Sequence, residues 1–307
     1  MKKKFIFWCF FSLIALSLFA QSNVNSVVTM EKGTDGSAGT NGQYVLFGVW
    51  PQSKKADSIK IDNSKSEKIN GWVCYKGSDN SYYVKVTSKP YDDYKFNDGS
   101  VIESGKDYYF RLDPIKWRVV DNNYQDGKLL VSEYILCSGS FSAADKDRKI
   151  NGPKINLNNY EKSSVRAWLN GLNGSEYGVE DFTNNGFINK AFSFDDIKNI
   201  KAVNPEKDKV FLLSQENVTN KNYGFADYKD SDKSRMRKTT DYARATVAYS
   251  NPEGDYLNNG WWWLRSPSDS FNNFSKGVKY DGSANMNYSI APDRRAGGFV
   301  PALSVSF

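Results

Sequence analysis

The chain has 307 residues, with 41 lysines and arginines against 35 aspartates and glutamates, three cysteines and no histidine. The absence of histidine excludes histidine-based acid–base catalysis, Ser-His and Cys-His nucleophile pairs, and the usual histidine-containing zinc sites. The nearly balanced charge lacks the basic footprint of nucleic-acid-binding domains, so we expect no nucleic-acid partner.

The first twenty residues have the pattern of a secretion signal. Three lysines at 2–4 precede an almost wholly apolar run over 5–19, and small or polar residues return from Ala20. The run is shorter than the about 20 residues that cross a bilayer. We predict a signal peptide over 1–20, export to the periplasm, cell surface or medium, and no membrane span after cleavage; Leu18 keeps an uncleaved anchor as the alternative. Without the three lysines, 38 basic residues face 35 acidic ones, a net charge of +3.

The remainder reads as a flexible lead-in over 21–41, rich in small polar residues, followed by a single domain over 42–307. Segments rich in β-branched and aromatic residues, bounded by turn residues, predict strands in the first half of this domain. Asp126-Gly127 between two of them indicates a tight hairpin, because both residues tolerate positive φ. The predicted strands are 44–50, 82–87, 108–112, 115–120 and 128–136.

The second half mixes helices and strands. The spacing of Val165, Trp168 and Leu169, with Ser163 or Ser164 as the N-cap, predicts a helix over 163–172. A second helix is expected over 184–192, and a short helix capped by Ser214. Strands are predicted over 210–213, 261–264, 277–280 and 299–307. Because helices and strands do not alternate regularly, the pattern favours an α+β class with an antiparallel sheet.

Eight short blocks in one order resemble a widespread bacterial family of extracellular domains of unknown function. The closing pattern, with a Trp-rich strand, an Asp281-Gly282 turn and a final Gly-x-x-Pro strand, is similar to C-type-lectin-like folds, including the formylglycine-generating enzymes. The resemblance implies a C-type-lectin-like core, with short antiparallel strands, a few helices and long polar loops. Val300 stands where the family often has an arginine. The blocks are FGVWPQ at 47–52, IKWRVV at 115–120, LLVSEYIL at 129–136, SSVRAWLN at 163–170, FINKAF at 187–192, VFLLS at 210–214, WWLRSP at 262–267 and GFVPAL at 298–303.

Long polar loops near the C-terminus are the preferred binding surface, because such loops on a rigid scaffold usually carry function. Three consecutive tryptophans place rings on both faces of one strand. Either a ring on one face points toward a ligand, or the strand lies in the core and both of its faces are covered. If Arg265 is buried, it needs a carboxylate such as Asp113 or Asp281. The basic residues within 229–244 favour a solvated loop over a site for an acidic polymer. The candidate ligand-binding residues are Trp261, Trp263, Arg265, Asp269, Asn272, Asn273, Asp293 and Arg294.

Two cysteines, Cys74 and Cys137, follow the signal. In an oxidising compartment they are candidates for one disulfide, and two buried free thiols are the alternative. They lie outside the C-terminal blocks, so the thiol chemistry of the enzymes with the suspected fold does not carry over. The stretch 121–127 is similar to a calcium loop, but its glycine falls one position late. We therefore expect no specific metal and no cofactor.

The function favoured by these patterns is a non-enzymatic binding or surface-interaction module that recognises a glycan or a protein through the C-terminal loops. Two alternatives stay open: an enzyme that uses carboxylates, and a structural protein of the cell envelope. Adjacent acids such as Asp195-Asp196 lie near predicted helix starts, where the helix dipole favours them. The sequence leaves the oligomeric state open.

Overall fold

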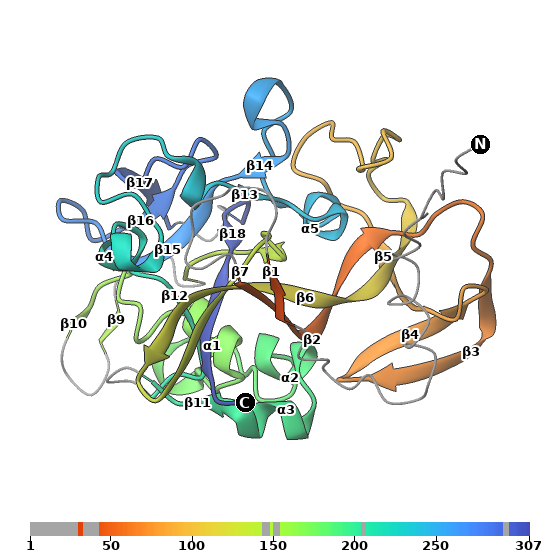
Figure 1. Ribbon diagram of the computed structural model, residues 1–307, viewed down its shortest axis with the longest axis horizontal. Coiled ribbons are helices and arrows are strands. Elements are labelled where there is room, and N and C mark those ends of the chain that lie inside the picture. Colours follow the sequence, from red (N-terminus) through yellow and green to blue (C-terminus); the bar gives the residue numbers. More distant parts are fainter. Residues whose placement is uncertain (1–29, 33–42, 143–147, 150–153, 204–206, 291–294) are drawn as a thin grey trace, which may run out of the picture.

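The chain is built mainly of curled antiparallel sheets. The computed structural model describes residues 30–32, 43–142, 148–149, 154–203, 207–290 and 295–307 (Figure 1). Strands account for 41% and helices for 15% of the structure. The α+β, C-type-lectin-like class expected from the sequence is therefore wrong. The predicted signal peptide lies outside the described residues.

A single long strand, β6 (Asp107–Tyr124), organises the larger sheet. It pairs along its length with β2 (Gln43–Lys54), β5 (Tyr82–Thr87) and β7 (Gly127–Ser132). The sequence predicts two strands here, 108–112 and 115–120, with Asp113-Pro114 between them. Pro114 instead lies opposite Val49, beside a bulge in β2 where the hydrogen-bond ladder is already interrupted, and proline is tolerated at such points.

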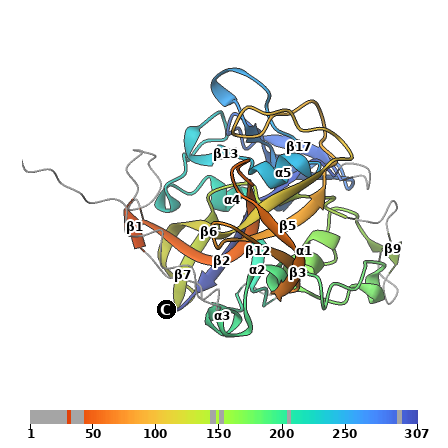
Figure 2. The ribbon, with the colours of Figure 1, turned by 90° about the vertical axis from the view of Figure 1, so that its right-hand side faces the viewer.

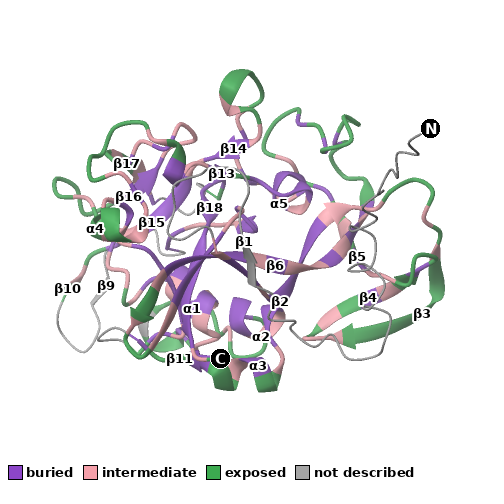
Figure 3. Cartoon of the chain, in the orientation of Figure 1, coloured by how far each residue is buried: buried purple, intermediate pink, exposed green. Residues whose placement is uncertain are grey.

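The larger sheet has the order β11-β19-β7-β6-β5-β4-β3, and β1, β2 and β12 attach beside this path. The bounds of its other strands are β1 Met30–Lys32, β3 Ile61–Ile69, β4 Trp72–Gly77, β11 Ile200–Lys201, β12 Val210–Leu212 and β19 Pro301–Val305. β1 falls inside the predicted lead-in yet pairs with the start of β2, at whose outer end Figure 2 shows it. The β3–β4 hairpin projects from the body, and β3 is almost wholly exposed (Figures 1 and 3).

A second, five-stranded sheet has the order β17-β16-β15-β18-β8 and carries the C-terminal loops. Its strands are β8 Cys137–Ser138, β15 Trp262–Pro267, β16 Phe274–Val278, β17 Met286–Ser289 and β18 Gly298–Phe299. Two short ribbons pair β9 (Arg148–Lys149) with β10 (Lys154–Ile155), and β13 (Arg237–Lys238) with β14 (Asn259–Gly260).

The helices are short, and local caps mark the ends of several of them. Ser163 accepts a hydrogen bond from the Arg166 N–H to start α1, and Gly171 ends α1 in the left-handed conformation. Ser214 starts α4 as predicted, by accepting from the Asn217 N–H. The helices are α1 Ser164–Asn170, α2 Phe187–Ala191, α3 Phe194–Asn199, α4 Gln215–Val218 and α5 Asp241–Ala245, with 3₁₀ turns at Ser175–Tyr177, Lys221–Tyr223, Lys233–Arg235 and Gly254–Tyr256.

Apolar residues cover both faces of the central strands. Helices α1, α2 and α3 lie on one side of the larger sheet, and α5 and the second sheet lie on the other (Figure 1). Trp263 packs into the core cluster that includes Phe187 of α2, and Trp262 packs into the opposite cluster with Ala243 of α5. The central strands are accordingly buried (Figure 3). The tryptophan strand thus crosses a core covered on both faces, the second of the two alternatives read from the sequence.

The predicted hairpin between β6 and β7 exists, but its turn lies one residue earlier than expected. Gln125 and Asp126 are the two central residues, with φ of 46° and 63°, and Tyr124 pairs with Gly127. Gly127 is needed for a different reason: a Cβ there would lie 2.8 Å from the Val305 carbonyl oxygen of β19.

The basic stretch 229–244 is not a solvated loop, because its three arginines are almost completely buried. Arg235 donates to the carbonyl oxygens of Gly282 (2.6 Å), Ala226 (3.1 Å), Val218 and Asp230, and so joins four segments of chain. Hydrogen bonds to carbonyls offset the cost of removing a guanidinium from water. The three arginines are Arg235, Arg237 and Arg244.

Candidate functional site

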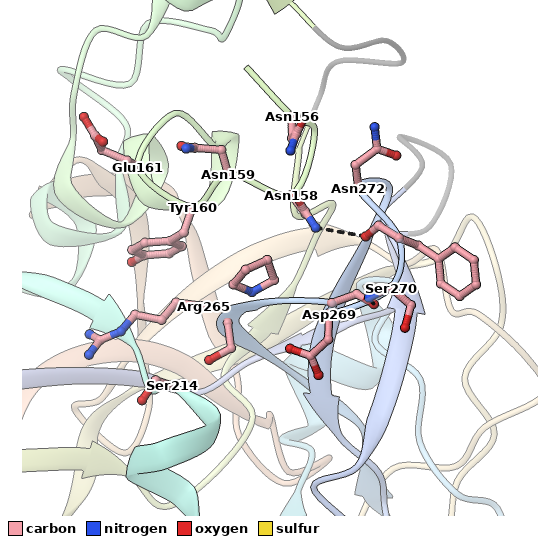
Figure 4. Close-up of a pocket in the computed structure, with 14 residues that line it drawn as sticks. Asn156, Asn158, Asn159, Tyr160, Glu161, Ser214, Arg265, Asp269, Ser270 and Asn272 are labelled. Carbon is pink, nitrogen blue, oxygen red and sulfur yellow. Dashed lines mark hydrogen bonds between the residues drawn. The ribbon is translucent and has the colours of Figure 1, made fainter. Parts of the chain in front are cut away.

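A large cleft opens where the loop between β15 and β16 faces the segment that precedes α1. We name it the loop cleft. Its volume is about 760 Å³, within the usual size range of small-molecule sites. Figure 4 shows the two walls and the side chains that line them. The lining residues are Asn156, Asn158, Asn159, Tyr160, Glu161, Ser214, Arg265, Ser266, Pro267, Ser268, Asp269, Ser270, Phe271 and Asn272.

Asn158 fastens the two walls together at the base of the cleft. Its buried side-chain amide donates to the carbonyl oxygens of Phe271 (3.0 Å) and Phe274 (2.9 Å), and its backbone N–H donates to that of Asn272 (3.1 Å). The loop is further tied to β15, because the Ser275 hydroxyl donates to the Leu264 and Ser266 carbonyls. The cleft is therefore preformed by three hydrogen bonds between segments more than a hundred residues apart.

Arg265 stands at the cleft, half-buried. Its guanidinium donates to the Asn217 side chain (3.3 Å) and lies 5.3 Å from the Phe211 ring centre. The sequence called for a carboxylate partner only if Arg265 were buried, and Asp113 and Asp281 instead pair with Arg111 and Lys279. Exposure to the cleft removes the need for a buried counter-charge.

Two carboxylates line the loop cleft. Asp269 accepts from Lys276 at 2.6 Å, and this hydrogen bond holds the pKa of Asp269 below its usual range. Glu161 lies 3.0 Å from Lys162, and its side chain is 50% exposed. On the same wall, the Tyr160 hydroxyl accepts from the Leu212 N–H, and burial raises the pKa of Tyr160, so its phenol is neutral at pH 7.

The structure brings together three of the residues selected from the sequence, Arg265, Asp269 and Asn272. Asn273 is exposed on the same loop but does not line the cleft, and its carbonyl accepts from Ile290. Asp293 and Arg294 lie outside the described residues.

The two predicted tryptophans lie away from the loop cleft. Trp263 is fully buried and donates to the Gly139 carbonyl at 3.1 Å. Trp261 is partly buried, and its ring stacks on Tyr288 with 3.9 Å between ring centres.

The 156–160 wall is the part of the cleft that the sequence reasoning missed. Its signal is the run Asn156-Leu157-Asn158-Asn159-Tyr160, in which amides surround one buried leucine. Such a run is equally typical of an ordinary turn. Only its contact with the distant Phe271 loop shows that it forms a wall of the cleft.

Cys74 and Cys137 are two separate, buried free thiols, so the disulfide alternative is not realised in this structure. Cys74 packs with Val49, Val84 and Leu112, whereas Cys137 belongs to the central cluster. Burial raises the pKa of Cys74 to about 11 and raises that of Cys137 as well.

Across the part of the chain that the structure describes, no three acidic, cysteine or histidine side chains converge as metal ligands would. Among those same residues, no helix combines the length and apolar character that a membrane crossing requires.

The fold and the loop cleft together define a mostly β scaffold that presents a ligand-sized cleft on loops. The chain belongs to the family described as a domain of unknown function (DUF6273), which it matches over residues 125–306. Both walls of the loop cleft fall inside this range, whereas the blocks at 47–52 and 115–120 precede it. Neither a curated protein nor a solved structure matches the chain.

Proposed function

We propose that this protein is an exported, non-enzymatic binding module that recognises a glycan through the loop cleft. The observation that carries this proposal is the composition of the preformed cleft: side-chain amides and hydroxyls surround a few apolar surfaces. A sugar ring has the complementary character, with hydroxyls at its edge and C–H groups on its faces. Sites of this kind use a few placed polar groups to orient a ligand against apolar walls.

Individual residues support a sugar over a wholly charged ligand. Arg265 supplies guanidinium donors, and Asn156 and Asn272 are exposed amides that both donate and accept. Phe271 is 58% exposed at the rim and lies 5.5 Å from the Phe274 ring centre, so its ring offers an apolar face.

Carboxylate-based hydrolysis is the second candidate, because Glu161 and Asp269 line the same cleft. A glycosidase needs one carboxylic acid with a raised pKa that protonates the leaving oxygen. Lys276 instead lowers the pKa of Asp269, whose side chain is 83% exposed. This environment favours binding over acid catalysis.

Export rests on the N-terminal pattern over 1–20, and it places the binding site where extracellular or envelope glycans occur. Expression of the full chain in a bacterial host, followed by fractionation and N-terminal sequencing, tests this part. A new N-terminus at Gln21 in the exported fraction is the expected result, and retention of an unprocessed chain in the cytoplasm would contradict it.

Binding is tested on glycan and envelope-protein arrays with Phe271→Ala and, as a matched control, Phe194→Ala. Phe194 is 76% exposed on α3, outside the loop cleft, so its loss should leave binding unchanged. Saturable binding to a glycan, weakened at least fivefold by Phe271→Ala and abolished by replacing 269–275, is the expected result. Release of reducing sugar that Glu161→Gln removes would indicate the enzyme, and silence on every array would indicate a structural role.

A further inference from the structure

A second cleft, of about 450 Å³, lies apart from the loop cleft and is walled by aromatic rings. We name it the tryptophan cleft. It lies where β2, β4, α1 and α5 meet, and two of its tryptophans precede the family-matched range. The aromatic residues that line it are Trp50, Trp72, Trp168, Phe182, Tyr242 and Phe299.

The rings form an upright arrangement around a buried floor. Trp50 is 3% exposed, and Trp72, Trp168 and Tyr242 meet it at interplanar angles of 85°, 88° and 88°. Trp72 and Tyr242 are also perpendicular to each other, at 85°. Because these three rings stand perpendicular to Trp50, their faces do not lie against it. All three are only partly buried. Trp168 also packs against Phe187 and Phe299, and Tyr242 against Phe110, so the cleft is lined by the parts of these rings that such contacts leave uncovered.

The rings are held in place before any ligand binds. The Trp50 indole N–H donates to the Leu136 carbonyl (3.2 Å), and the Trp72 indole N–H donates to the Lys190 carbonyl (3.0 Å). Preorganised side chains lose little conformational entropy on binding, which favours affinity. Among the described residues, the hydroxyl of Tyr242 has no hydrogen-bond partner, so it remains available to a molecule in the cleft.

Polar groups complete the wall. The hydroxyls of Ser138 and Ser140 and the amide of Asn185 lie beside the rings. Aromatic faces surrounded by hydrogen-bonding groups suit a molecule with apolar faces and a polar edge, as a pyranose ring has.

A quaternary ammonium group also binds aromatic cages, but the charges of this cleft disfavour it. Among the described lining residues, Lys190 and Arg295 carry positive charge and Glu180 alone carries negative charge. The Lys190 ammonium already lies 4.9 Å from the centre of the Trp72 ring, where an ammonium ligand would compete with it. A net positive lining favours a neutral or acidic sugar.

We propose that the tryptophan cleft is a second carbohydrate site, which takes a pyranose unit against its upright aromatic rings. This site would bind the same class of ligand as the proposed function, but its lining residues differ from those of the loop cleft. Two sites on one chain raise the avidity for a polymer that reaches both.

The experiment titrates the full chain with chitohexaose, cellohexaose, hexagalacturonate and choline chloride, and follows binding by calorimetry. Each titration is repeated in a Phe271→Ala background, which weakens the loop cleft. In that background Trp168→Ala should raise the Kd for the bound hexasaccharide at least tenfold. Tyr242→Phe, which preserves ring packing, should raise it at least threefold. Trp261→Ala is the matched control, since this partly buried tryptophan lies outside both clefts and should change the Kd less than twofold.

The outcomes separate the two proposals. Sugar binding that disappears in Phe271→Ala and is unaffected by Trp168→Ala or Tyr242→Phe overturns the tryptophan site and leaves the loop cleft. Binding that survives Phe271→Ala and is weakened at least threefold by Tyr242→Phe, with an unchanged melting temperature, supports the tryptophan site alone. Binding of choline with no response to any hexasaccharide overturns it.

Discussion

Asp241 is the centre of a buried polar cluster, and its neutralisation should destabilise the fold strongly. Its carboxylate accepts hydrogen bonds from the Arg244 guanidinium, the Asn97 N–H (2.8 Å) and the Lys54 N–H (3.0 Å). The side chains of Arg244 and Asp241 are 1% and 6% exposed. Burial lowers the pKa of Arg244, and the charge of Asp241 and its hydrogen bond to Arg244 oppose that shift, so the carboxylate helps to stabilise the buried cation. Asp241→Asn keeps the shape and removes the charge.

The structure sets the size of the effect. Removing one partner of a buried ion pair costs about 3–5 kcal/mol, because the other charge is left uncompensated. In Asp241→Asn, the new side-chain amide also places its own N–H group opposite at least one of the three groups that donate to the carboxylate. An internal control exists: Lys198 and Asp195 form the same i,i+3 pair in α3 but are 59% and 87% exposed. Exposed pairs contribute about 0–1 kcal/mol, so Asp195→Asn should cost less than about 1 kcal/mol.

Urea unfolding followed by tryptophan fluorescence and far-ultraviolet circular dichroism measures both variants by linear extrapolation. Asp241→Asn should lose about 3–5 kcal/mol, and adding Arg244→Met should restore part of this, because the uncompensated cation is then removed. Equal losses in Asp241→Asn and Asp195→Asn, or a loss below about 1 kcal/mol in Asp241→Asn, would refute the reasoning.

Three further predictions follow from the fold. Hydrogen bonds from Lys54 and Ser100 hold the pKa of Asp98 well below its usual range. The stability that Asp98 contributes is therefore present above its unfolded pKa of about 3.9 and is lost as the pH falls through its folded pKa. Asp98→Asn should make the melting temperature depend less on pH between pH 4 and pH 2. Cys74 and Cys137 should resist iodoacetamide at pH 8 in the folded chain and react in guanidinium, as peptide mass spectrometry will show; labelling without denaturant would contradict their burial. Gly127→Ala should cost about 1–3 kcal/mol in urea unfolding, since its Cβ would meet Val305, and an unchanged midpoint would count against that contact.

Local sequence signals located most of the strands and caps but misjudged the class. The predicted strand 82–87 coincides with β5, and Ser163 and Ser214 cap the helices expected after them. The error came from weighting two helical patterns heavily, because the helices that they mark are only 7 and 5 residues long. Strand pairing between distant segments, as in β2 with β6, determines the architecture, and such pairing leaves no local signature.

Burial of charge was the second limit. Arg235 and Arg237 stand in a stretch that reads as a solvated loop, because arginine and lysine signal exposure wherever partners are unknown. Their partners are mostly carbonyl oxygens, which every residue possesses and no sequence pattern reveals. Likewise Arg265, Asp269 and Asn272 were selected from one loop, but the opposite wall around Asn158 becomes visible only once the chain is folded.

Helix α1 lines the tryptophan cleft and directly follows the 156–160 wall of the loop cleft in the chain. Tyr160 of the loop cleft and Trp168 of the tryptophan cleft lie on either side of the start of α1. The helix is anchored to the body at both ends: Arg166 pairs with the buried Asp208 at 2.8 Å, and the Asn170 amide donates to the Val210 carbonyl of β12 at 2.7 Å. Because β12 pairs with β19 in the larger sheet, any displacement of α1 must break contacts in the core. The α1 wall of the tryptophan cleft is therefore part of the packed scaffold, and a ligand there would meet a wall already in position.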